Sequence, residues 1–208
     1  MSRLIAFGCS FTYGAGLVDI YPRNLRSSRF AWPEILGNKL SRSVVNQAKP
    51  GIGNLEILNH VLTTKFQPSD IAVIMWSQFS RHDFFRYKAI PIGGRLIGTA
   101  GEAEFLKYNP IEEDWWINNN RARNWLTIHH CSLYLQSLNI PFVSFLGIVG
   151  YNDTLPYPSL EIPNLLKDIK SQDWIIDKAM DINDKDGAHP GLESHKLIAN
   201  LIYDKIKQ

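Results

Sequence analysis

Short apolar runs alternate along the chain with longer segments whose apolar residues recur at helical spacing. A short apolar or β-branched run bounded by turn-forming residues is typical of a strand. The run from Asp70 to Trp76 is the strongest of these, and it is apolar on both faces, as expected of a central parallel strand. Strands are therefore predicted at residues 3–8, 43–46, 70–76, 140–146 and 174–176.

Helices are predicted between these runs. Pro33 suits the first turn of one helix, and the leucine and valine residues after Asn54 recur at helical spacing in the next. The expected helices cover Trp32–Leu40, Asn54–Phe66, about Asn120–Leu138, and a C-terminal segment that starts near Pro190. This alternation favours an α/β protein in which helices cover both faces of a mostly parallel sheet.

The segment from 82 to 118 does not follow this alternation. It is rich in aromatic residues, contains several glycines and shows no clean period. Segments of that length inside a compact domain are usually lids, binding loops or disordered, and the aromatic content argues against disorder. We therefore interpret it as an insertion near the functional site. Its aromatic side chains either form a platform for substrate or make up a small core of the insertion itself.

The length of 208 residues is compatible with a single domain that spans the whole chain, residues 1–208. With 45% hydrophobic residues and a formal net charge of +2, the sequence is neither a disordered chain nor a strongly basic nucleic-acid binder. Two cysteines, Cys9 and Cys131, are too few for a disulfide scaffold. No apolar run reaches the length of a membrane span, and the run after Met1 is too short for a signal peptide. We therefore expect a cytoplasmic protein.

The first predicted strand ends in a turn of small residues, Phe7-Gly8-Cys9-Ser10-Phe11-Thr12-Tyr13-Gly14. That turn places Ser10 at the carboxyl end of the sheet, where the ligand sites of open α/β folds lie. A serine there can act as a nucleophile when a base accepts its proton, or it can simply cap the helix that follows. Cys9 is expected to point the other way, into the core, since free cysteines are commonly buried.

A candidate base stands near the other end of the chain, in the segment Asp186-Gly187-Ala188-His189-Pro190-Gly191. An imidazole can accept a serine proton near neutral pH, and a carboxylate can fix the tautomer of that imidazole. The offset of three residues across a Gly-Ala turn lets one loop present both His189 and Asp186. The alternative is an acidic loop of the calcium-binding type with Asp181 and Asp184, but no glutamate stands at the later ligand position.

Two further segments are candidates for stabilising an oxyanion. Asn46-Gln47-Ala48-Lys49-Pro50-Gly51-Ile52-Gly53-Asn54 follows the second predicted strand, and its glycines let the backbone approach a ligand closely. The spacing of these glycines matches neither common nucleotide-binding pattern. The central strand runs into Trp76-Ser77-Gln78-Phe79-Ser80-Arg81, where Arg81 could bind an anionic substrate group or pair with a carboxylate.

Neither a metal nor an organic cofactor is expected. No set of histidine, cysteine and carboxylate residues has the spacing of a zinc site, and His129 and His130 are helical neighbours that do not share a face. A flavin-binding protein of the same layer order would need a phosphate loop rich in serine and threonine after the first strand. Phe11-Thr12-Tyr13 is a poor match to such a loop.

The order of these segments resembles that of the SGNH (GDSL-like) hydrolase family. Phe-Gly-Cys-Ser-Phe-Thr resembles the family's first block, and Asp186-x-x-His189-Pro190 resembles its last block. The resemblance implies that Ser10 is the nucleophile, His189 the base and Asp186 the acid of a catalytic triad. Gly51 best matches the family's oxyanion glycine, with Gly53 as the alternative. The resemblance also implies a flavodoxin-like, three-layer α/β/α sandwich with about five parallel strands in the order 2-1-3-4-5.

Two positions depart from the family pattern. Cys9 replaces the aspartate that usually precedes the nucleophile, a residue that is not a member of the triad. Gln78 falls where the family has its oxyanion asparagine, and it offers an amide donor on a longer arm. The remaining candidates for the oxyanion hole and for substrate binding are Ser77, Arg81, Gly53 and Asn54.

The residues and the resemblance together predict a serine esterase that hydrolyses a carboxylic ester through an acyl-serine intermediate. O-acetyl or short acyl groups, including those on a glycan, are the candidate substrates, and neither nucleic acid nor a membrane is expected as a partner. Two alternatives stay open. One is an O-acyltransferase that uses the same triad, and the other is a non-catalytic glycan- or peptide-binding module on the same fold.

Overall fold

The structure is a computed structural model of the chain, and it describes residues 2–20, 26–79, 81–85, 91–96, 113–147 and 189–207. For residues 82, 84–85, 91–96 and 113–121 it describes the backbone only.

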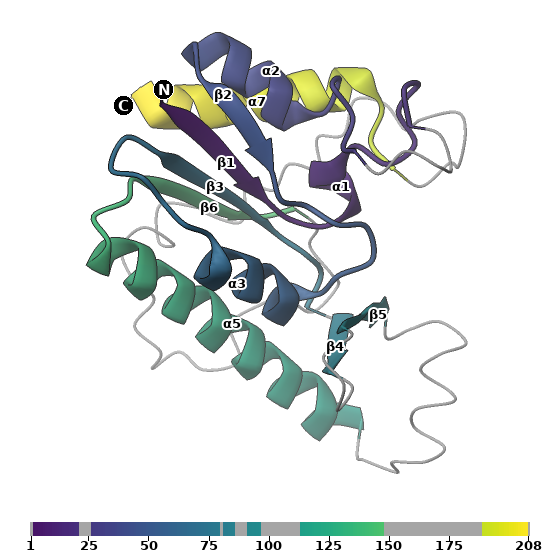
Figure 1. Cartoon of the computed structure of the whole chain (residues 1–208). Coiled ribbons are helices and arrows are strands. Elements are labelled where there is room, and N and C mark those ends of the chain that lie inside the picture. Colours follow the sequence, from purple (N-terminus) through teal and green to yellow (C-terminus); the bar gives the residue numbers. More distant parts are fainter. Residues whose placement is uncertain are drawn as a thin grey trace.

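A parallel sheet of four strands forms the centre of the described part (Figure 1). Its order is β2-β1-β3-β6. Because β6 is the fourth strand of this sheet along the chain, the order corresponds to the expected 2-1-3-4. The strands are β1 (Arg3–Phe7), β2 (Ser43–Asn46), β3 (Ile71–Trp76) and β6 (Phe142–Leu146). The α/β fold class and the first four positions of the expected order are confirmed. The fifth strand, expected at 174–176, lies outside the described residues.

Helices cover both faces of this sheet, as the three-layer prediction requires (Figure 1). On one face lie α2 (Trp32–Leu40) and α7 (Leu192–Lys207), which pack against each other. On the other face lie α3 (Asn54–Thr63) and α5 (Glu113–Ser137), which also pack against each other. A four-residue helix, α1 (Ser10–Tyr13), follows β1 directly at the carboxyl end of the sheet.

The alternation of side chains along the strands divides the core into two clusters. In β1, Ile5 and Phe7 belong to the cluster under α3 and α5, whereas Leu4 and Ala6 belong to the cluster under α2 and α7. In β3 the residues from Ala72 to Trp76 are at most 1% exposed, so both faces of this strand are covered. Successive side chains of a strand point to opposite faces, and a strand buried on both faces therefore needs an unbroken apolar run.

The segment from 82 to 118, which shows no clean period in the sequence, contains regular structure in its described part, whereas residues 86–90 and 97–112 lie outside the described residues. Two antiparallel strands, β4 (Arg81–Phe85) and β5 (Pro91–Leu96), pair there, with a register shift between His82 and Phe84. The proline and the two glycines of β5 are poor strand formers, which explains why the sequence pattern does not reveal it. The following helix also begins at Glu113, seven residues before the expected start at Asn120. Asparagine has a low helix propensity, and the run Asn118–Asn120 hides this early start.

Both cysteines are free and buried in the core cluster under α3 and α5. Cys9 is 1% exposed, in agreement with the expected inward orientation of its side chain. Burial raises the pKa of the Cys131 thiol to about 12, so this group stays protonated at neutral pH.

Among the described helices, none is both long enough and apolar enough to cross a lipid bilayer.

Candidate active site

The turn that carries Ser10 is tightly built. An ideal Cβ at Gly8 would lie 2.1 Å from Thr12 Oγ1 and 2.9 Å from the carbonyl oxygen of Met75, so only glycine fits between β1 and the start of α1. Gly14 ends α1 with a φ of 80°, a left-handed conformation that favours glycine. The two glycines therefore fix the strand–turn–helix that presents Ser10 at the carboxyl end of β1.

The side chain of Ser10 is buried at this turn. The residue is 3% exposed, and its Oγ has no hydrogen-bond partner among the described residues. Buried hydroxyl groups are usually hydrogen-bonded, and a catalytic role is one of the known reasons for an unpartnered one. Among the described residues, Thr12 Oγ1 and Ser77 Oγ share this state, so the nucleophile assignment does not rest on it alone. The structure therefore leaves the proposed nucleophile uncommitted to any structural hydrogen bond in the part of the chain that it describes.

His189 lies beside this turn, although it comes from the other end of the chain. Its imidazole packs edge-on against the ring of Phe11, the residue after Ser10, with 5.4 Å between ring centroids and 71° between ring planes. The following Gly191 accepts a hydrogen bond from the His195 N–H at 3.2 Å, which opens helix α7. The start of α7 thus delivers His189 to the serine turn.

The remainder of the predicted triad stays a prediction. Asp186 lies outside the described residues. A hydrogen bond between the imidazole of His189 and Ser10 Oγ is not formed in this structure. Catalytic hydrogen bonds are often long or misaligned in the free enzyme and tighten in the complex with substrate, so the observed placement is compatible with proton transfer.

The glycine loop that follows β2 is fastened to the serine turn. Asn46 Nδ2 donates to the carbonyl oxygen of Thr12 at 2.9 Å, and Asn46 Oδ1 accepts from the Ala48 N–H at 3.0 Å. The Lys49 N–H donates to the carbonyl oxygen of Gly8 at 3.2 Å. Gly51 then adopts a φ of 82°. The structure therefore brings the loop of the predicted oxyanion glycine next to the predicted nucleophile.

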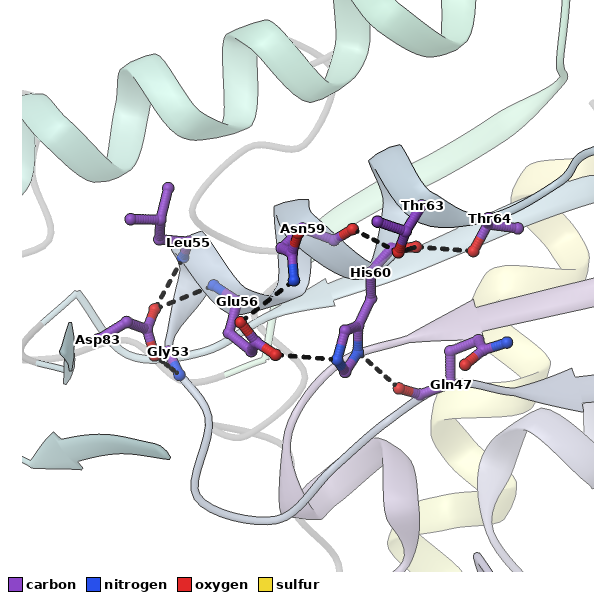
Figure 2. Close-up of polar contacts among 9 residues, drawn as sticks. All are labelled: Gln47, Gly53, Leu55, Glu56, Asn59, His60, Thr63, Thr64 and Asp83. Carbon is purple, nitrogen blue, oxygen red and sulfur yellow. Dashed lines mark hydrogen bonds and ion pairs between the residues drawn. The ribbon is translucent and has the colours of Figure 1, made fainter. Parts of the chain in front are cut away.

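The other end of this loop, where α3 begins, is capped by a residue that the sequence analysis missed. Asp83, on β4, is 7% exposed. Its Oδ1 accepts from the Gly53 N–H at 2.6 Å, and its Oδ2 accepts from the N–H groups of Leu55 at 2.9 Å and Glu56 at 3.1 Å (Figure 2). Carboxylates are favourable at helix N-termini because they accept from unpaired N–H groups and complement the helix dipole. The only signal in the sequence is an isolated acidic residue within the aromatic segment after the central strand.

Gly53 is required by this cap. An ideal Cβ at Gly53 would lie 2.6 Å from Asp83 Oδ2, so any side chain there would collide with the carboxylate. The position that was considered as an alternative oxyanion glycine therefore has a structural reason to be glycine, and its N–H is already donated to Asp83.

Asn54 and Ser77 are paired with each other below the site. Asn54 is 1% exposed, and its Oδ1 accepts from the Ser77 N–H at 2.7 Å. Its Nδ2 donates to the Ser77 carbonyl oxygen at 3.1 Å and to Asn124 Oδ1 at 2.6 Å. Asn124 Nδ2 in turn donates to the Phe79 carbonyl oxygen at 3.2 Å. This network joins α3, α5 and the end of β3, and it occupies both amide hydrogens of Asn54.

Gln78 and Arg81 lie on the chain that leaves β3. The carbonyl oxygen of Gln78 accepts from the Arg81 N–H at 3.1 Å, and the Gln78 side chain is half-buried. Arg81 Nη1 donates to the carbonyl oxygen of Ile52 at 3.2 Å. The guanidinium group of Arg81 is therefore engaged with the glycine loop. Within the described ranges, no group of three or more His, Cys, Asp and Glu side chains is arranged to hold a metal ion.

No protein-family model matches the sequence, and no curated protein matches it either. The fold is similar to that of several solved structures over nearly the whole chain. For a structure of TesA the TM-score is 0.54 at 12% identity, covering 100% of this chain and 98% of that chain. For the lipase Lip_vut3 from a goat rumen metagenome the TM-score is 0.52 at 14% identity, covering 98% and 97%.

A third similar structure is the acetyl xylan esterase Est2A from the rumen bacterium Butyrivibrio proteoclasticus. Its TM-score is 0.53 at 12% identity, covering 99% of this chain and 63% of that chain. At these identities the likeness concerns the arrangement of strands and helices and not the residues of the site. The chain has an SGNH hydrolase-like α/β/α fold.

Proposed function

We propose that this protein is a serine esterase that hydrolyses a carboxylic ester through an acyl-serine intermediate. The observation that carries the proposal is the imidazole of His189 packed against Phe11, next to Ser10, at the carboxyl end of β1. Ligand sites of open α/β folds lie at this end of the sheet. Similar solved structures bear the names of a lipase and an acetyl xylan esterase, which supports the same reaction class.

The first half of the reaction forms the acyl-enzyme. Ser10 Oγ attacks the ester carbonyl carbon while His189 accepts the hydroxyl proton. The carbonyl oxygen becomes an oxyanion, for which the N–H groups of Ser10 and Gly51 and the side-chain amide of Gln78 are the proposed donors. The carbon–oxygen bond to the alcohol then breaks, and the leaving alkoxide takes the proton from His189.

The second half returns the enzyme to its starting state. A water molecule gives a proton to His189 and attacks the acyl carbon through the same oxyanion site. The bond to Ser10 Oγ breaks, and the serine regains its proton from His189 as the carboxylic acid leaves. Asp186 is proposed to orient the imidazole and to stabilise its protonated form throughout the cycle.

The proposed substrate is an O-acetyl or short acyl ester, including an ester carried by a glycan. Est2A supports this choice, because it is named as an acetyl xylan esterase and shares the fold. Acyl transfer to a sugar hydroxyl is the second candidate, since an alcohol can replace water in the second half-reaction.

Hydrolysis of p-nitrophenyl acetate tests the proposal. The wild-type protein should release p-nitrophenol, and Ser10→Ala should reduce release to the background rate. Ser132→Ala is the matched control, because Ser132 is also 3% exposed but lies on α5 and donates to the Ile128 carbonyl oxygen. Its activity should equal that of the wild type. Equal rates for Ser10→Ala and the wild type would contradict the proposal.

The same assay separates hydrolysis from acyl transfer. With an oligosaccharide acceptor present, an esterase releases only acetate, whereas a transferase forms an acetylated sugar that mass spectrometry detects. The absence of both products, together with binding of the oligosaccharide, would favour a non-catalytic glycan-binding module instead.

A further inference from the structure

The peptide group between Ile52 and Gly53 is held at both of its polar atoms by one strand. Arg81 Nη1 donates to the Ile52 carbonyl oxygen at 3.2 Å, and Asp83 Oδ1 accepts from the Gly53 N–H at 2.6 Å. These two atoms belong to the same planar peptide unit, whose orientation is therefore fixed by two side chains of β4. We refer to Arg81 and Asp83 as the β4 clamp.

Gly51, the residue before Ile52, faces open space where a side chain would stand. An ideal Cβ at Gly51 would have no heavy atom within 4 Å, and the left-handed φ of 82° separates this residue from regular structure. The direction of the Gly51 N–H therefore depends on how the chain is held on either side. The β4 clamp supplies the hold on the C-terminal side, one residue away.

The N-terminal side of the loop is held by a separate set of contacts that leads back to the same carboxylate. His60 Nδ1 lies 3.0 Å from the Gln47 carbonyl oxygen, and His60 Nε2 lies 3.2 Å from Glu56 Oε1 (Figure 2). The N–H of Glu56 donates to Asp83. The two ends of the loop, Gln47 and Gly53, are thus connected through the first two turns of α3. The contacts run from Gln47 through His60 and Glu56 to Asp83, which also holds Gly53.

We propose that Asp83 and Arg81 are positioning residues for the oxyanion hole, because they fix the Ile52–Gly53 peptide and thereby anchor the C-terminal side of the segment that carries the Gly51 N–H. This inference rests on the proposed esterase function. Neither residue touches the reacting atoms in this proposal, and both act through the glycine loop. A donor must lie about 2.7–3.1 Å from the oxyanion to be effective, so a small displacement of the Gly51 N–H, after the anchor at Ile52 and Gly53 is loosened, removes much of its contribution.

The chemistry of the clamp requires an aspartate at position 83. An ionised carboxylate offers two acceptor oxygens, and here Oδ1 serves the loop while Oδ2 serves the helix. An asparagine has one acceptor oxygen and one donor nitrogen. If its oxygen keeps the Leu55 and Glu56 N–H groups, its NH₂ group faces the Gly53 N–H. Asp83→Asn should therefore leave α3 capped and release the loop.

Steady-state kinetics with p-nitrophenyl acetate test this inference. Loss of one oxyanion donor typically lowers the rate by about 10²–10³, so partial misorientation in Asp83→Asn should lower kcat by about 10- to 100-fold. KM should change by less than about twofold, because the ester in its ground state does not yet carry the oxyanion charge. Arg81→Met should also lower kcat, but by a smaller factor. It removes only the hydrogen bond that Arg81 donates to the uncharged Ile52 carbonyl oxygen.

Asp70→Asn is the matched control for a general loss of stability. Asp70 is also a buried aspartate that accepts hydrogen bonds, but it stands at the amino end of β3, at the opposite edge of the sheet. This variant should unfold at a lower temperature and keep the wild-type kcat. Thermal unfolding of every variant, followed by circular dichroism, shows the fraction folded at the assay temperature.

The outcomes separate the clamp from the proposed function. A folded Asp83→Asn variant with wild-type kcat would overturn the clamp and leave the esterase proposal intact. A fall in kcat that Asp70→Asn shares would also overturn it. If Asp83→Asn does not fold, Arg81→Met decides, because Arg81 is less buried than Asp83 and methionine keeps the apolar stem of its side chain. Wild-type hydrolysis that does not depend on Ser10 would overturn both proposals.

Discussion

Two buried aspartates lie near opposite ends of the parallel sheet, one just before β3 and the other on β4 of the separate antiparallel pair, and they are held in different ways. Asp70, just before β3, accepts from Arg3 Nε at 2.9 Å and from the Gln67 N–H at 2.7 Å. Hydrogen bonds from the Arg3 guanidinium hold the pKa of the Asp70 carboxyl below its usual range. Asp83, at the carboxyl end, instead accepts from the backbone N–H groups of three residues at the start of α3.

The two kinds of partner indicate different roles for the two aspartates. The partner of Asp70 is a charged side chain on the neighbouring strand, so this pair joins β1 to β3 and stabilises the fold. The partners of Asp83 are backbone N–H groups of the glycine loop and of the first turn of α3, so this carboxylate ties the helix to the loop that is fastened to the serine turn. Loss of the first should affect stability alone, and loss of the second should also affect the reaction.

The largest effect is expected for Ser10→Ala, which tests whether the carboxyl end of the sheet carries the chemistry. Removing the nucleophile of a catalytic triad lowers kcat by about 10⁶-fold in well-studied cases, so ester hydrolysis should fall to background. Stability should be unchanged or slightly higher, because the buried hydroxyl has no hydrogen-bond partner among the described residues. Enzyme kinetics and thermal unfolding of the same preparation measure both quantities.

A smaller effect is expected for Gly53→Ala, which disturbs the carboxyl end without removing a reacting group. The new Cβ would lie 2.6 Å from Asp83 Oδ2, so the carboxylate must move away from the glycine loop. We expect kcat to fall by about tenfold through the misplaced oxyanion donor. Overpacking of this kind should also lower the free energy of unfolding by about 1–3 kcal/mol. A variant with wild-type kcat would show that Gly53 matters only for folding.

Asp70→Asn disturbs the other end of the sheet. Breaking a buried ion pair is strongly destabilising, but Arg3 is 26% exposed in its side chain, so the loss should be about 1–3 kcal/mol in the free energy of unfolding. Denaturant unfolding measures this loss. A fall in kcat in this variant, at a temperature where it is fully folded, would contradict the division of roles between the two ends.

The smallest effect is expected for pH, which should change the difference in stability between the wild type and Asp70→Asn. Because the pKa of Asp70 is lowered in the folded protein, its stabilising contribution is present above the ordinary value of about 3.9 and is lost as pH falls through the folded value. The wild type and Asp70→Asn should therefore differ most in unfolding temperature near neutral pH and converge in strong acid. A constant difference across this range would exclude the ionised pair as its cause.

Much of the fold follows from local pattern. The helix at Trp32–Leu40 and the strand at Ser43–Asn46 occur with the predicted bounds. The strands around them differ from prediction by one or two residues. The unbroken apolar run of β3 predicted a central strand, because only a strand covered on both faces can bury all of its side chains. Ser10 and His189 were singled out by residue type and context, and the structure places both at one end of the sheet.

The long-range hydrogen bonds that hold the site in place could not be predicted from the sequence. Asp83 caps a helix whose N-cap residue, Gly53, stands 30 residues earlier in the chain, and no local pattern records such a contact. The same holds for Asn54, whose amide pairs with the backbone of Ser77 at the end of another strand. These contacts exist only after the sheet and helices have come together, so they depend on tertiary packing and not on periodicity.

Covalent labelling of Ser10 tests the central claim most directly, because it does not require the natural substrate. The protein is treated with a serine-directed fluorophosphonate and digested, and the modified peptide is identified by mass spectrometry. We predict a single adduct on Ser10 that forms in the wild type and is lost in His189→Ala, since the imidazole must accept the serine proton. No adduct, or an adduct on another serine, would contradict the assignment of Ser10 and His189 as nucleophile and base.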